Sequence, residues 1–487
     1  MKSIYKSILL KLVNYIPYNG WLCGGSIRDI LLEKPCRDID LVVPKDALTI
    51  ARYTAQRLNA TFVPLHEEEG VARVVSKDLI IDFSQFRNGA KEIHEDLLLR
   101  DFTINSMAIA LKDLNKIIKK YKKETITAYI IDPTGGLNDL NSGLIRCVSK
   151  KNLKQDPLRL IRAIRFKTEL NFNIEHITSS WIKELAQTIL DVAKERIQYE
   201  LEILMSQKNS CDGIKSLHNH ELLLQLVPEM ACAIGIDQPG FHHLDVFNHL
   251  IEALCQIDKI IEAPSKFFST SKIMTSWCSE NIKKLPYLRF ASLFHDIGKP
   301  YCLAKRDDGR VTFHQHDKKG AELVKNIGKR LRWSKKSIEF TSRLVRLHMR
   351  PFFLIRDFKL GGPTPRAMTR LLKETGTDYP ALFMVAMSDA LSANGPLTPK
   401  DMPEILDKLF IKIHNFYLER LKPVEKSPPL LNGFDIQKIF GIEPGPIIGK
   451  ILKAVEQAQI ERNISSKDEA CEFVKRWLKQ CNQHHHI

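Results

Sequence analysis

The sequence predicts an α+β head, a mixed β-sheet with helices, followed by an all-α body. Two observations predict this division. Between about residues 20 and 145, short apolar or alternating runs are separated by turn residues, which is typical of strands. From Asp156 onward, apolar residues recur every three or four positions in one amphipathic helix after another. A chain of 487 residues is also long enough for several compact units.

Six runs in the head are predicted as strands. They are Trp21–Cys23, Ile39–Val43, Thr61–Pro64, Val71–Val75, Leu79–Phe83 and Tyr129–Asp132. Ahead of them, residues 1–17 predict an amphipathic helix. Lys6 and Lys11 interrupt its apolar residues too often for a signal peptide.

Soft boundaries in the body follow from composition. Ala263–Lys284 is rich in Ser and Lys and is expected to be an inserted loop, whereas Ser392–Pro403 and Lys422–Gly433 are rich in Pro. We therefore expect a head (1–145), a helical neck (146–230), a larger helical unit (231–395) and a C-terminal helical tail (396–487).

Charge and cysteine usage narrow the class of protein. There are 73 Lys and Arg residues against 57 Asp and Glu, a formal charge of +16, which favours a polyanionic partner such as nucleic acid. The 10 cysteines include no CxxC pair, so we expect reduced thiols in a cytoplasmic protein. No apolar run reaches the length of a membrane span, and no membrane partner is expected.

A glycine pair follows the first predicted strand. Gly24 and Gly25 stand between that strand and a predicted helix. Such a turn lets backbone N–H groups approach a triphosphate, and the helix N-terminus adds a favourable dipole. A Gly-Gly turn alone is usually only a turn, so the interpretation depends on its neighbours.

Three aspartates accompany the glycine pair. Asp38 and Asp40 are two positions apart on a predicted strand, which places both carboxylates on one face. Asp82 lies in an apolar run, where an unpaired carboxylate is costly. The set predicts catalysis by Asp38, Asp40 and Asp82, with Asp38 and Asp40 as ligands of Mg²⁺. The structural alternative is that Asp38 caps a turn and Asp82 ends a strand.

Five segments in order resemble the motifs of one family. They are Gly24-Gly25-x-x-Arg28-Asp29 with Asp38-x-Asp40, Glu95-Asp96-x-x-x-Arg100-Asp101-Phe-Thr-Ile-Asn105, Asp132-Pro-Thr-Gly-Gly-Leu-Asn-Asp139, Asp156-Pro-Leu-Arg159-Leu-Ile-Arg162-Ala-Ile-Arg165 and Glu195-Arg196-Ile-Gln-Tyr-Glu200. Together they resemble the class II tRNA nucleotidyltransferases and bacterial poly(A) polymerases, of the polymerase-β-like superfamily. The resemblance implies tRNA, ATP and CTP as partners, a second motif that recognises the ribose and a third that forms a hinge. It implies nucleotide binding by Gly24, Gly25, Arg28, Arg100, Asp101, Asn105, Asp156, Arg159, Arg162 and Arg165.

The fourth motif has a chemical interpretation of its own. Asp156 and Arg159 are three apart at a predicted helix start and can reach the same point. A carboxylate with a guanidinium complements the amine donor and ring-nitrogen acceptor of cytosine and adenine. The alternative is that Asp156 is simply the N-cap before Pro157. The family often has Glu where this chain has Gln155.

Two further features concern RNA and the product. Arg146–Lys167 holds eight basic residues and one acidic residue, and its Arg159, Arg162 and Arg165 form a stripe. Some of these basic residues are expected to meet triphosphate or RNA, and a solvated face is the alternative for those outside the motif. After Asp82 only residues 86–94 precede the second motif. Relatives that add all of CCA usually carry a longer segment there, so this chain resembles the CC-adding branch.

A second site is predicted in the body. His249, His295-Asp296 and Asp389 occur in the order of an HD domain, with HisAsp expected on one helix, and His316 and His348 fall where HD phosphohydrolases place further ligands. The resemblance is to the HD domain fused to many bacterial tRNA nucleotidyltransferases. It implies a divalent metal such as Ni²⁺, Mn²⁺ or Mg²⁺, and phosphatase or 2′,3′-cyclic phosphodiesterase activity. A lone helical His is more often structural than a ligand.

Rival functions remain open at this point. A poly(A) polymerase shares every head motif, and an HD phosphohydrolase with an RNA-binding head is a second alternative. A pure RNA-binding protein is disfavoured because it gains nothing from three head carboxylates. The basic stretch Lys325–Arg350, which includes Trp333, is expected to contact RNA, with an ordinary solvated face as the alternative. The tail from Leu430 onward resembles the C-terminal helical region of the same HD-fused proteins, which implies contacts with the tRNA body.

Overall fold

The computed structural model describes residues 19–34, 38–77, 79–120, 123–238, 240, 242–359 and 362–483. The helix predicted for residues 1–17 lies outside them. The chain separates into two compact units, Met1–Gln207 with Asp212–Leu226 and Lys208–Cys211 with Val227–Ile487. Each unit is described by itself.

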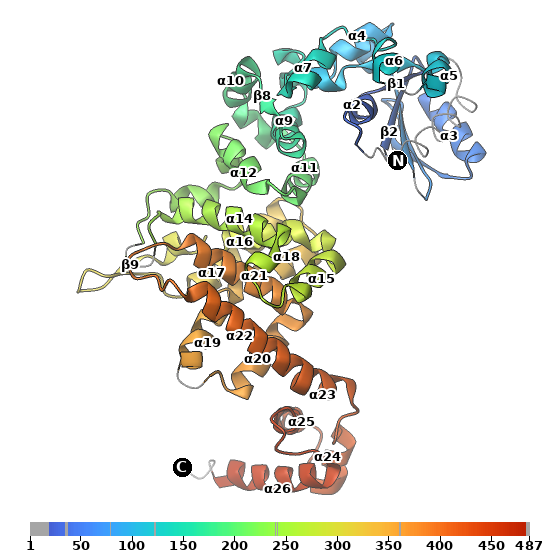
Figure 1. Ribbon diagram of the computed structural model, residues 1–487. Coiled ribbons are helices and arrows are strands. Elements are labelled where there is room, and N and C mark those ends of the chain that lie inside the picture. Colours follow the sequence, from blue (N-terminus) through green and yellow to red (C-terminus); the bar gives the residue numbers. More distant parts are fainter. Residues whose placement is uncertain are drawn as a thin grey trace. The chain divides into compact units, whose positions relative to one another are not determined.

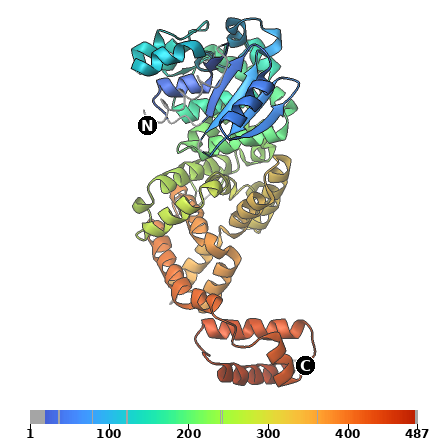
Figure 2. The same ribbon diagram turned by 90° about the vertical axis from the view of Figure 1, so that its right-hand side faces the viewer.

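A six-stranded mixed sheet forms the head, in the order β3-β4-β5-β2-β1-β6. Its strands are β1 (Trp21–Cys23), β2 (Asp38–Val43), β3 (Thr61–His66), β4 (Val71–Val75), β5 (Ile80–Gln85) and β6 (Ala108–Ala110). β2 and β5 are parallel, and the other neighbouring strands are antiparallel. Helix α3 (Ala47–Arg57) packs along β3, β4 and β5 (Figure 2).

Alternation along β2 and β5 separates the core from the acids. Ile39, Leu41, Ile81 and Phe83 are buried within the head. Because side chains alternate across a strand, the aspartates between these residues lie on the opposite face. The predicted α+β head is confirmed, and five of the six predicted strands form.

The strand predicted at Tyr129–Asp132 is wrong. Only Ile131 pairs, in an isolated bridge with Ala108, and β6 takes the edge position instead. The carboxylate of Asp132 accepts hydrogen bonds from the backbone N–H groups of Gly136 and Leu137 at 2.8 and 2.9 Å. It therefore fixes the turn into the next helix and ends the extended segment.

Helices complete the first unit. In the head they are α2 (Gly25–Leu31), α4 (Ile93–Leu98), α5 (Leu111–Lys120), α6 (Lys123–Thr127) and α7 (Gly136–Ser142). Behind them follow α8 (Lys150–Gln155), α9 (Leu158–Leu170), α10 (His176–Glu184), α11 (Lys194–Ser206), α12 (Ser210–Asn219) and α13 (Leu223–Leu226), with the short pair β7 (Leu144–Ile145) and β8 (Asn173–Ile174). α9 and α11 pack against each other, as the helical periodicity predicts.

The second unit is almost wholly helical (Figure 1). Its larger helices are α14 (Val246–Glu262), α15 (Ser271–Glu280), α16 (Leu285–Phe294), α17 (His316–Arg330), α18 (Lys335–Leu347), α19 (Arg350–Lys359), α20 (Pro365–Thr375), α21 (Tyr379–Ser392) and α22 (Met402–Phe416). A small hairpin, β9 (Ala304–Lys305) and β10 (Val311–Thr312), precedes α17. α21 is mostly apolar, is buried on nearly all sides and packs against α14, α16, α18 and α22, which places it at the centre of the core.

The tail adds a small core of its own within this unit. α23 (Lys422–Lys426) leads to α24 (Gly433–Phe440), α25 (Pro446–Ile460) and α26 (Lys467–Gln483). Ile436, Ile451 and Val474 are buried together between the last three helices. Asn432 and Asp435 form a capping box that starts α24.

Three expectations for the body are corrected. Ala263–Lys284 is not an inserted loop, because Met274 and Trp277 anchor α15 in the core. The thiols are not all free, since Cys211 and Cys255 form a disulfide with Cα atoms 5.0 Å apart. Trp333 packs against Tyr287 and Phe290 and is buried, so it does not face RNA. No helix among the described residues is long and apolar enough to cross a membrane.

A buried ion pair yields a test of this packing. The Asp258 carboxylate accepts from Arg289 Nε at 2.6 Å and from the Cys211 backbone N–H at 2.9 Å. Asp258→Ala leaves Arg289 buried without its partner and is expected to lower the free energy of unfolding by about 3–5 kcal/mol. The exposed Asp308–Arg310 pair supplies the control: Asp308→Ala should change it by no more than about 1 kcal/mol. Thermal denaturation measures both, and equal effects would contradict the assignment.

Candidate active site and metal centre

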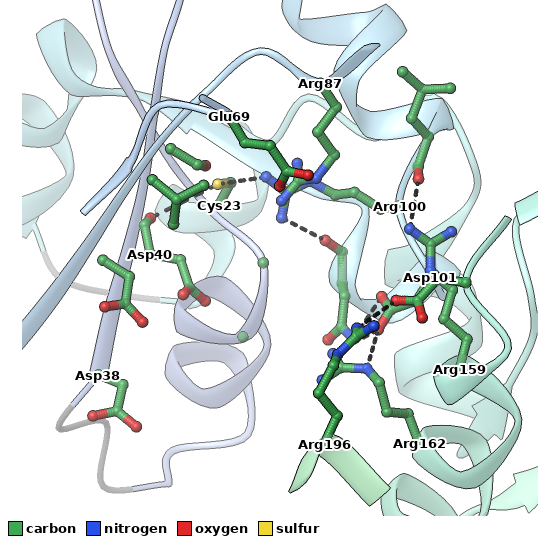
Figure 3. Close-up of a pocket in the computed structure, with 18 of the residues that line it drawn as sticks. Cys23, Asp38, Asp40, Glu69, Arg87, Arg100, Asp101, Arg159, Arg162 and Arg196 are labelled. Atoms are coloured by element: carbon green, nitrogen blue, oxygen red, sulfur yellow. Dashed lines mark hydrogen bonds and ion pairs between the residues drawn. The ribbon is translucent and has the colours of Figure 1, made fainter. Parts of the chain in front are cut away.

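A cavity of about 1060 Å³ opens in the first unit. The β1–α2 turn, β2 and β5 form one side, and the segment after α4 together with α9 and α11 forms the other. Asp38 and Asp40 face Arg159, Arg162 and Arg196 across it (Figure 3). An acidic wall thus lies opposite a basic wall.

The glycine pair is required by the close approach of an acid. Gly24 has a φ of 66°, and a Cβ there would lie 2.9 Å from an Arg100 nitrogen and 3.0 Å from Asp40 Oδ2. The Gly25 backbone N–H donates to the Asp40 carboxylate. The predicted strand–glycine turn–helix is therefore formed by β1, Gly24 and α2.

Strand pairing brings the three head acids to one region. Asp40 on β2 is the direct neighbour of Asp82 on β5, and Asp38 lies two residues before Asp40 on the same face. Asp82 also forms a two-pronged ion pair with Arg73 of β4, with Nε–Oδ1 and Nη2–Oδ2 distances of 2.7 and 2.8 Å. Arg73 stands directly opposite Asp82 in the β4–β5 register.

The pKa values of Asp38 and Asp40 are raised, which is consistent with a cation site. Burial raises the pKa of Asp40, and the charge of Asp82 raises it further. Burial and the same neighbour raise the pKa of Asp38. A divalent cation would relieve this repulsion, and a set of carboxylate oxygens suits Mg²⁺.

The three head acids are not gathered as tightly as the donors of the body. Among the described residues, the groups of three or more donors that all lie within 4.8 Å of one another are both in the body. Like charges repel, and the Asp82 carboxylate is held by Arg73. The residues nevertheless fit a divalent cation, which would have to draw the acids together.

The second motif forms a connected network on the other side of the cavity. The Asp101 carboxylate accepts from Arg162 at 2.7 Å and from the Asn105 amide at 3.1 Å. Asn105 Oδ1 in turn accepts from Arg28 at 2.8 Å. Burial alone would raise the pKa of Asp101, but the Arg162 guanidinium holds it well below its usual range. Asp101 thus stays ionised and orients the groups around it.

The fourth motif is present but differently paired from expectation. Asp156 accepts from Arg196 at 2.8 Å, and Arg159 donates to the backbone carbonyls of Asn152 and Leu99 at 3.1 and 3.2 Å. Both side chains line the cavity. Asp156 also accepts from the Leu158 backbone N–H at 3.3 Å, so the capping role is present as well.

The arginine stripe of α9 is tied to acids. Arg162 and Arg165 both donate to Glu200 of α11, at 3.2 and 2.5 Å, and Arg165 also pairs with Glu169. These pairs fix the two guanidinium groups at the cavity wall.

Sequence reasoning missed several residues of the cavity. Arg73, Arg87 and Glu69 all line it. Arg73 could have been found from its position opposite Asp82, but only if the β4–β5 register had been known. Buried Asp96 accepts from Arg87 at 2.9 Å and from Arg100 at 3.2 Å, so it links the short loop after β5 to the second motif.

All six predicted ligands of the body meet in one cluster. One group comprises His249, His295, Asp296 and Asp389, and the other comprises Asp296, His316 and His348. Asp296 belongs to both: its Oδ2 lies 3.3 Å from His295 Nε2 and its Oδ1 lies 3.1 Å from His316 Nε2. His295 and Asp296 do not lie on a helix as expected, but in the turn that follows α16.

The ring orientations prepare this cluster for metal. Nδ1 of His295, His316 and His348 lies 2.7–2.8 Å from a backbone carbonyl oxygen, to which it donates. His249 Nδ1 instead contacts the Ser392 hydroxyl at 3.2 Å. Every ring therefore presents Nε2 to the cluster, as metal-ligating histidines do.

The carboxylate of Asp296 supports the same conclusion. It is buried, and its Oδ1 lies 3.1 and 3.5 Å from Nε2 of His316 and His348, while its Oδ2 contacts Lys299 Nζ at 2.5 Å. A buried carboxylate surrounded by imidazole nitrogens is a donor set that suits a divalent cation. Lys299 also donates to Gln238 at 2.6 Å, and His242 lies 3.5 Å from its Nζ. No motif had pointed to Gln238 or His242.

Metal binding at this cluster should release protons. Burial opposes protonation of His295, but Asp296 and Asp389 raise the pKa of its ring to about 10. At pH 7 the metal-free ring is therefore protonated, and a cation must displace that proton. We expect proton release on loading with Mn²⁺, and affinity that rises with pH up to about 10.

Calorimetry in two buffers of different ionisation enthalpy measures the released protons. His348→Gln is the matched variant, because it removes a ligand and leaves His295 in place. Binding without any proton release at pH 7 would contradict the protonated state of His295.

Comparison with known proteins places the chain in a family. The Poly A polymerase head domain matches residues 20–146, the RNA and SrmB-binding site of polymerase A residues 171–234, the HD domain residues 246–375 and tRNA nucleotidyltransferase domain 2 residues 402–474. The A-adding tRNA nucleotidyltransferase of Deinococcus radiodurans is 31% identical over 95% of this chain and 96% of that protein. The CC-adding enzyme of Thermus thermophilus is 28% identical over 95% and 94%.

Solved structures share the fold. A CCA-adding enzyme in complex with ATP superposes with a TM-score of 0.63 at 21% identity, covering 98% of each chain. The Thermotoga maritima CCA-adding enzyme complexed with tRNA gives a TM-score of 0.57 at 21% identity, over 94% of this chain and 91% of that one. With the acids, the cavity and the HD cluster in place, the chain belongs to the class II tRNA nucleotidyltransferase family with a fused HD domain.

Proposed function

We propose that the chain transfers CMP or AMP from CTP or ATP to the 3′ end of tRNA, without a template. The observation that carries this is the cavity in which Asp38, Asp40 and Asp82 face the α9 arginines, with Arg28 and Arg100 beside the glycine turn. A triphosphate between these walls would be bound by arginines while its α-phosphorus faces the acids. The chain's relatives named A-adding and CC-adding tRNA nucleotidyltransferases support the same activity.

The reaction needs little beyond positioning and charge. The RNA 3′-hydroxyl oxygen bonds to the α-phosphorus, the bond to the bridging oxygen breaks, and pyrophosphate leaves while the hydroxyl proton passes to solvent. Mg²⁺ held by Asp38 and Asp40 would lower the pKa of that hydroxyl and steady the leaving group. Arg28 and Arg100 are held at the glycine turn by Asn105 and Asp96, where they bind the negative charge of the phosphates.

Base selection is assigned to the fourth motif. Asp156 can accept from the exocyclic amine of cytosine or adenine, while Arg159 donates to the neighbouring ring nitrogen. Arg196 pairs with the Asp156 carboxylate at 2.8 Å and holds it at the cavity wall. Guanine and uracil present the opposite donor pattern and leave both groups unpaired.

The short loop after β5 favours a partial product, CC. Arg87, near the start of this loop, is held by the Asp96 carboxylate, which accepts from the Arg87 backbone N–H at 3.0 Å and from its guanidinium. A short loop held in this way is poorly suited to switching the pocket from C to A. Addition of the terminal A alone is the second candidate, because the relative at 31% identity is named A-adding.

The HD unit is proposed to hold a divalent transition metal such as Ni²⁺ or Mn²⁺, or else Mg²⁺. Four imidazoles and two carboxylates suit these ions. Such a centre supplies Lewis-acid chemistry for phosphoester hydrolysis, for example of a 2′,3′-cyclic phosphate. The proposed limits of the units are 1–145, 146–230, 231–395 and 396–487, and the proposed location is the cytoplasm, where tRNA is processed.

Incorporation at nucleotide resolution tests the proposed activity. Labelled tRNA lacking its 3′ end is offered CTP, ATP or both, and tRNA ending in CC is offered ATP. We expect two C residues on the first substrate and no extension of the second. Asp40→Asn should reduce the rate by at least about 100-fold, and His348→Gln, which touches only the HD cluster, should not reduce it. Long A tracts without C would establish a poly(A) polymerase instead.

Arg73 is proposed as a positioning residue that acts through Asp82. Arg73→Ala removes both hydrogen bonds to this carboxylate and is expected to lower kcat about 10- to 100-fold, with a changed Mg²⁺ requirement. Arg73→Lys keeps the positive charge but cannot form both hydrogen bonds to the Asp82 carboxylate, so partial activity is expected. Lys77→Ala, an exposed position beyond the end of β4, is the control. An unchanged Mg²⁺ titration for Arg73→Ala would exclude the role.

A further inference from the structure

A second cavity, of about 290 Å³, lies between α19 and α20 in the body. α19 contributes Arg350, Phe353 and Leu354, and α20 contributes Arg366, Ala367, Arg370 and Leu371, with Thr364 at the turn between them. None of these residues belongs to the HD cluster or to the motifs of the head. We call this cavity the α19–α20 pocket.

The pocket carries an excess of positive charge. Arg370 pairs with Glu374 at 3.0 Å, and Arg350 reaches the same carboxylate at 3.9 Å. Arg366 is exposed and forms no hydrogen bond or ion pair with any residue that the structure describes. The Glu374 carboxylate thus lies next to two guanidinium groups, and a third, that of Arg366, is exposed to solvent. An anion would complete this arrangement.

The rest of the pocket is apolar and contains an aromatic ring. Leu354 and Leu371 are buried and form its floor. Phe353 is 57% exposed, which leaves its ring open to stacking. A flat aromatic group with an attached anion matches a phenylalanine bordered by arginines.

We propose that the α19–α20 pocket binds one nucleotide of the tRNA substrate, with the base on Phe353 and the adjoining phosphates on Arg350, Arg366 and Arg370. This proposal rests on tRNA being the substrate. The cavity lies at the lower limit of small-ligand sites, about 300 Å³, so it has room for a single nucleotide and not for a duplex. The occupant is therefore an unstacked residue of a loop or an end, the form in which proteins bind RNA bases.

Charge favours RNA over a protein partner. A peptide would have to bring an acidic group and an aromatic or apolar side chain together at the same spacing. Every nucleotide carries both, and the chain as a whole has a net charge of +16. A free nucleotide has the same chemistry, so the experiment must separate it from RNA.

Binding of fluorescein-labelled tRNA lacking its CCA end, measured by anisotropy on the full chain without CTP or ATP, tests the pocket. Phe353→Ala should weaken binding about 5- to 100-fold, and Phe353→Trp should restore it. Arg366→Ala should reduce the slope of log K against log salt by about one. Lys408→Ala, an exposed cation on α22 outside the pocket, should leave both quantities unchanged.

The outcomes are separable from those of the proposed function. The binding assay contains no CTP or ATP, so it measures tRNA affinity and not nucleotide addition. The affinity therefore tests the pocket even in Asp40→Asn, which is expected to lose nucleotide addition. In the transfer assay, Phe353→Ala should raise KM for tRNA and leave kcat unchanged. Thermal unfolding of each variant shows that it is folded.

Three results would overturn the proposal. One is unchanged tRNA affinity in both Phe353→Ala and Arg366→Ala. Another is Phe353-dependent binding of AMP with no effect on tRNA, which would identify a site for free nucleotides. The third is equal weakening by Lys408→Ala, which would reduce the pocket to general surface charge.

Discussion

Parallel pairing of β2 with β5 is the constraint on which the head depends. It sets Asp40 beside Asp82, and strand alternation adds Asp38 on the same face while Ile39, Leu41 and Phe83 fill the core. Three carboxylates in one partly buried region repel one another, and this repulsion destabilises the folded head. Burial, followed by the charge of Asp82, raises the pKa values of Asp38 and Asp40.

The surrounding arginines partly offset the repulsion between the head carboxylates. Arg73 clamps Asp82, and Arg100 lies beside the glycine turn next to Asp40. On the opposite wall, Asp101 and Glu200 hold the α9 arginines in place through buried ion pairs. These pairs are weak evidence of stability but fix geometry, because breaking one leaves a buried charge. In the body, the backbone fixes Nδ1 of three imidazoles and Ser392 contacts that of the fourth, so that all four rings face Asp296 or Asp389.

Much of this was legible in the sequence. Alternation gave five strands and the common face of Asp38 and Asp40, and helical periodicity gave the body. Motif order indicated His249 and Asp389 as partners across 140 residues, a contact that no local pattern reveals. The failures have physical causes. The Ser- and Lys-rich stretch Ala263–Lys284 contains a helix, α15, because Trp277 packs into the core. The strand predicted to end at Asp132 does not form, and the Asp132 side chain instead accepts hydrogen bonds in the turn that follows. Arg73 and the α19–α20 pocket depend on register and helix packing, which composition does not encode.

The central claim is that the head acids bind divalent cations beside the triphosphate. A crystal structure of the full chain with Mn²⁺ and a non-hydrolysable CTP analogue, read by anomalous scattering, tests it most directly. The account predicts a manganese peak between Asp38 and Asp40, with the analogue's phosphates next to it and its base near Asp156 and Arg159. A triphosphate bound elsewhere, or phosphates in the cavity with no manganese at these aspartates, would contradict it.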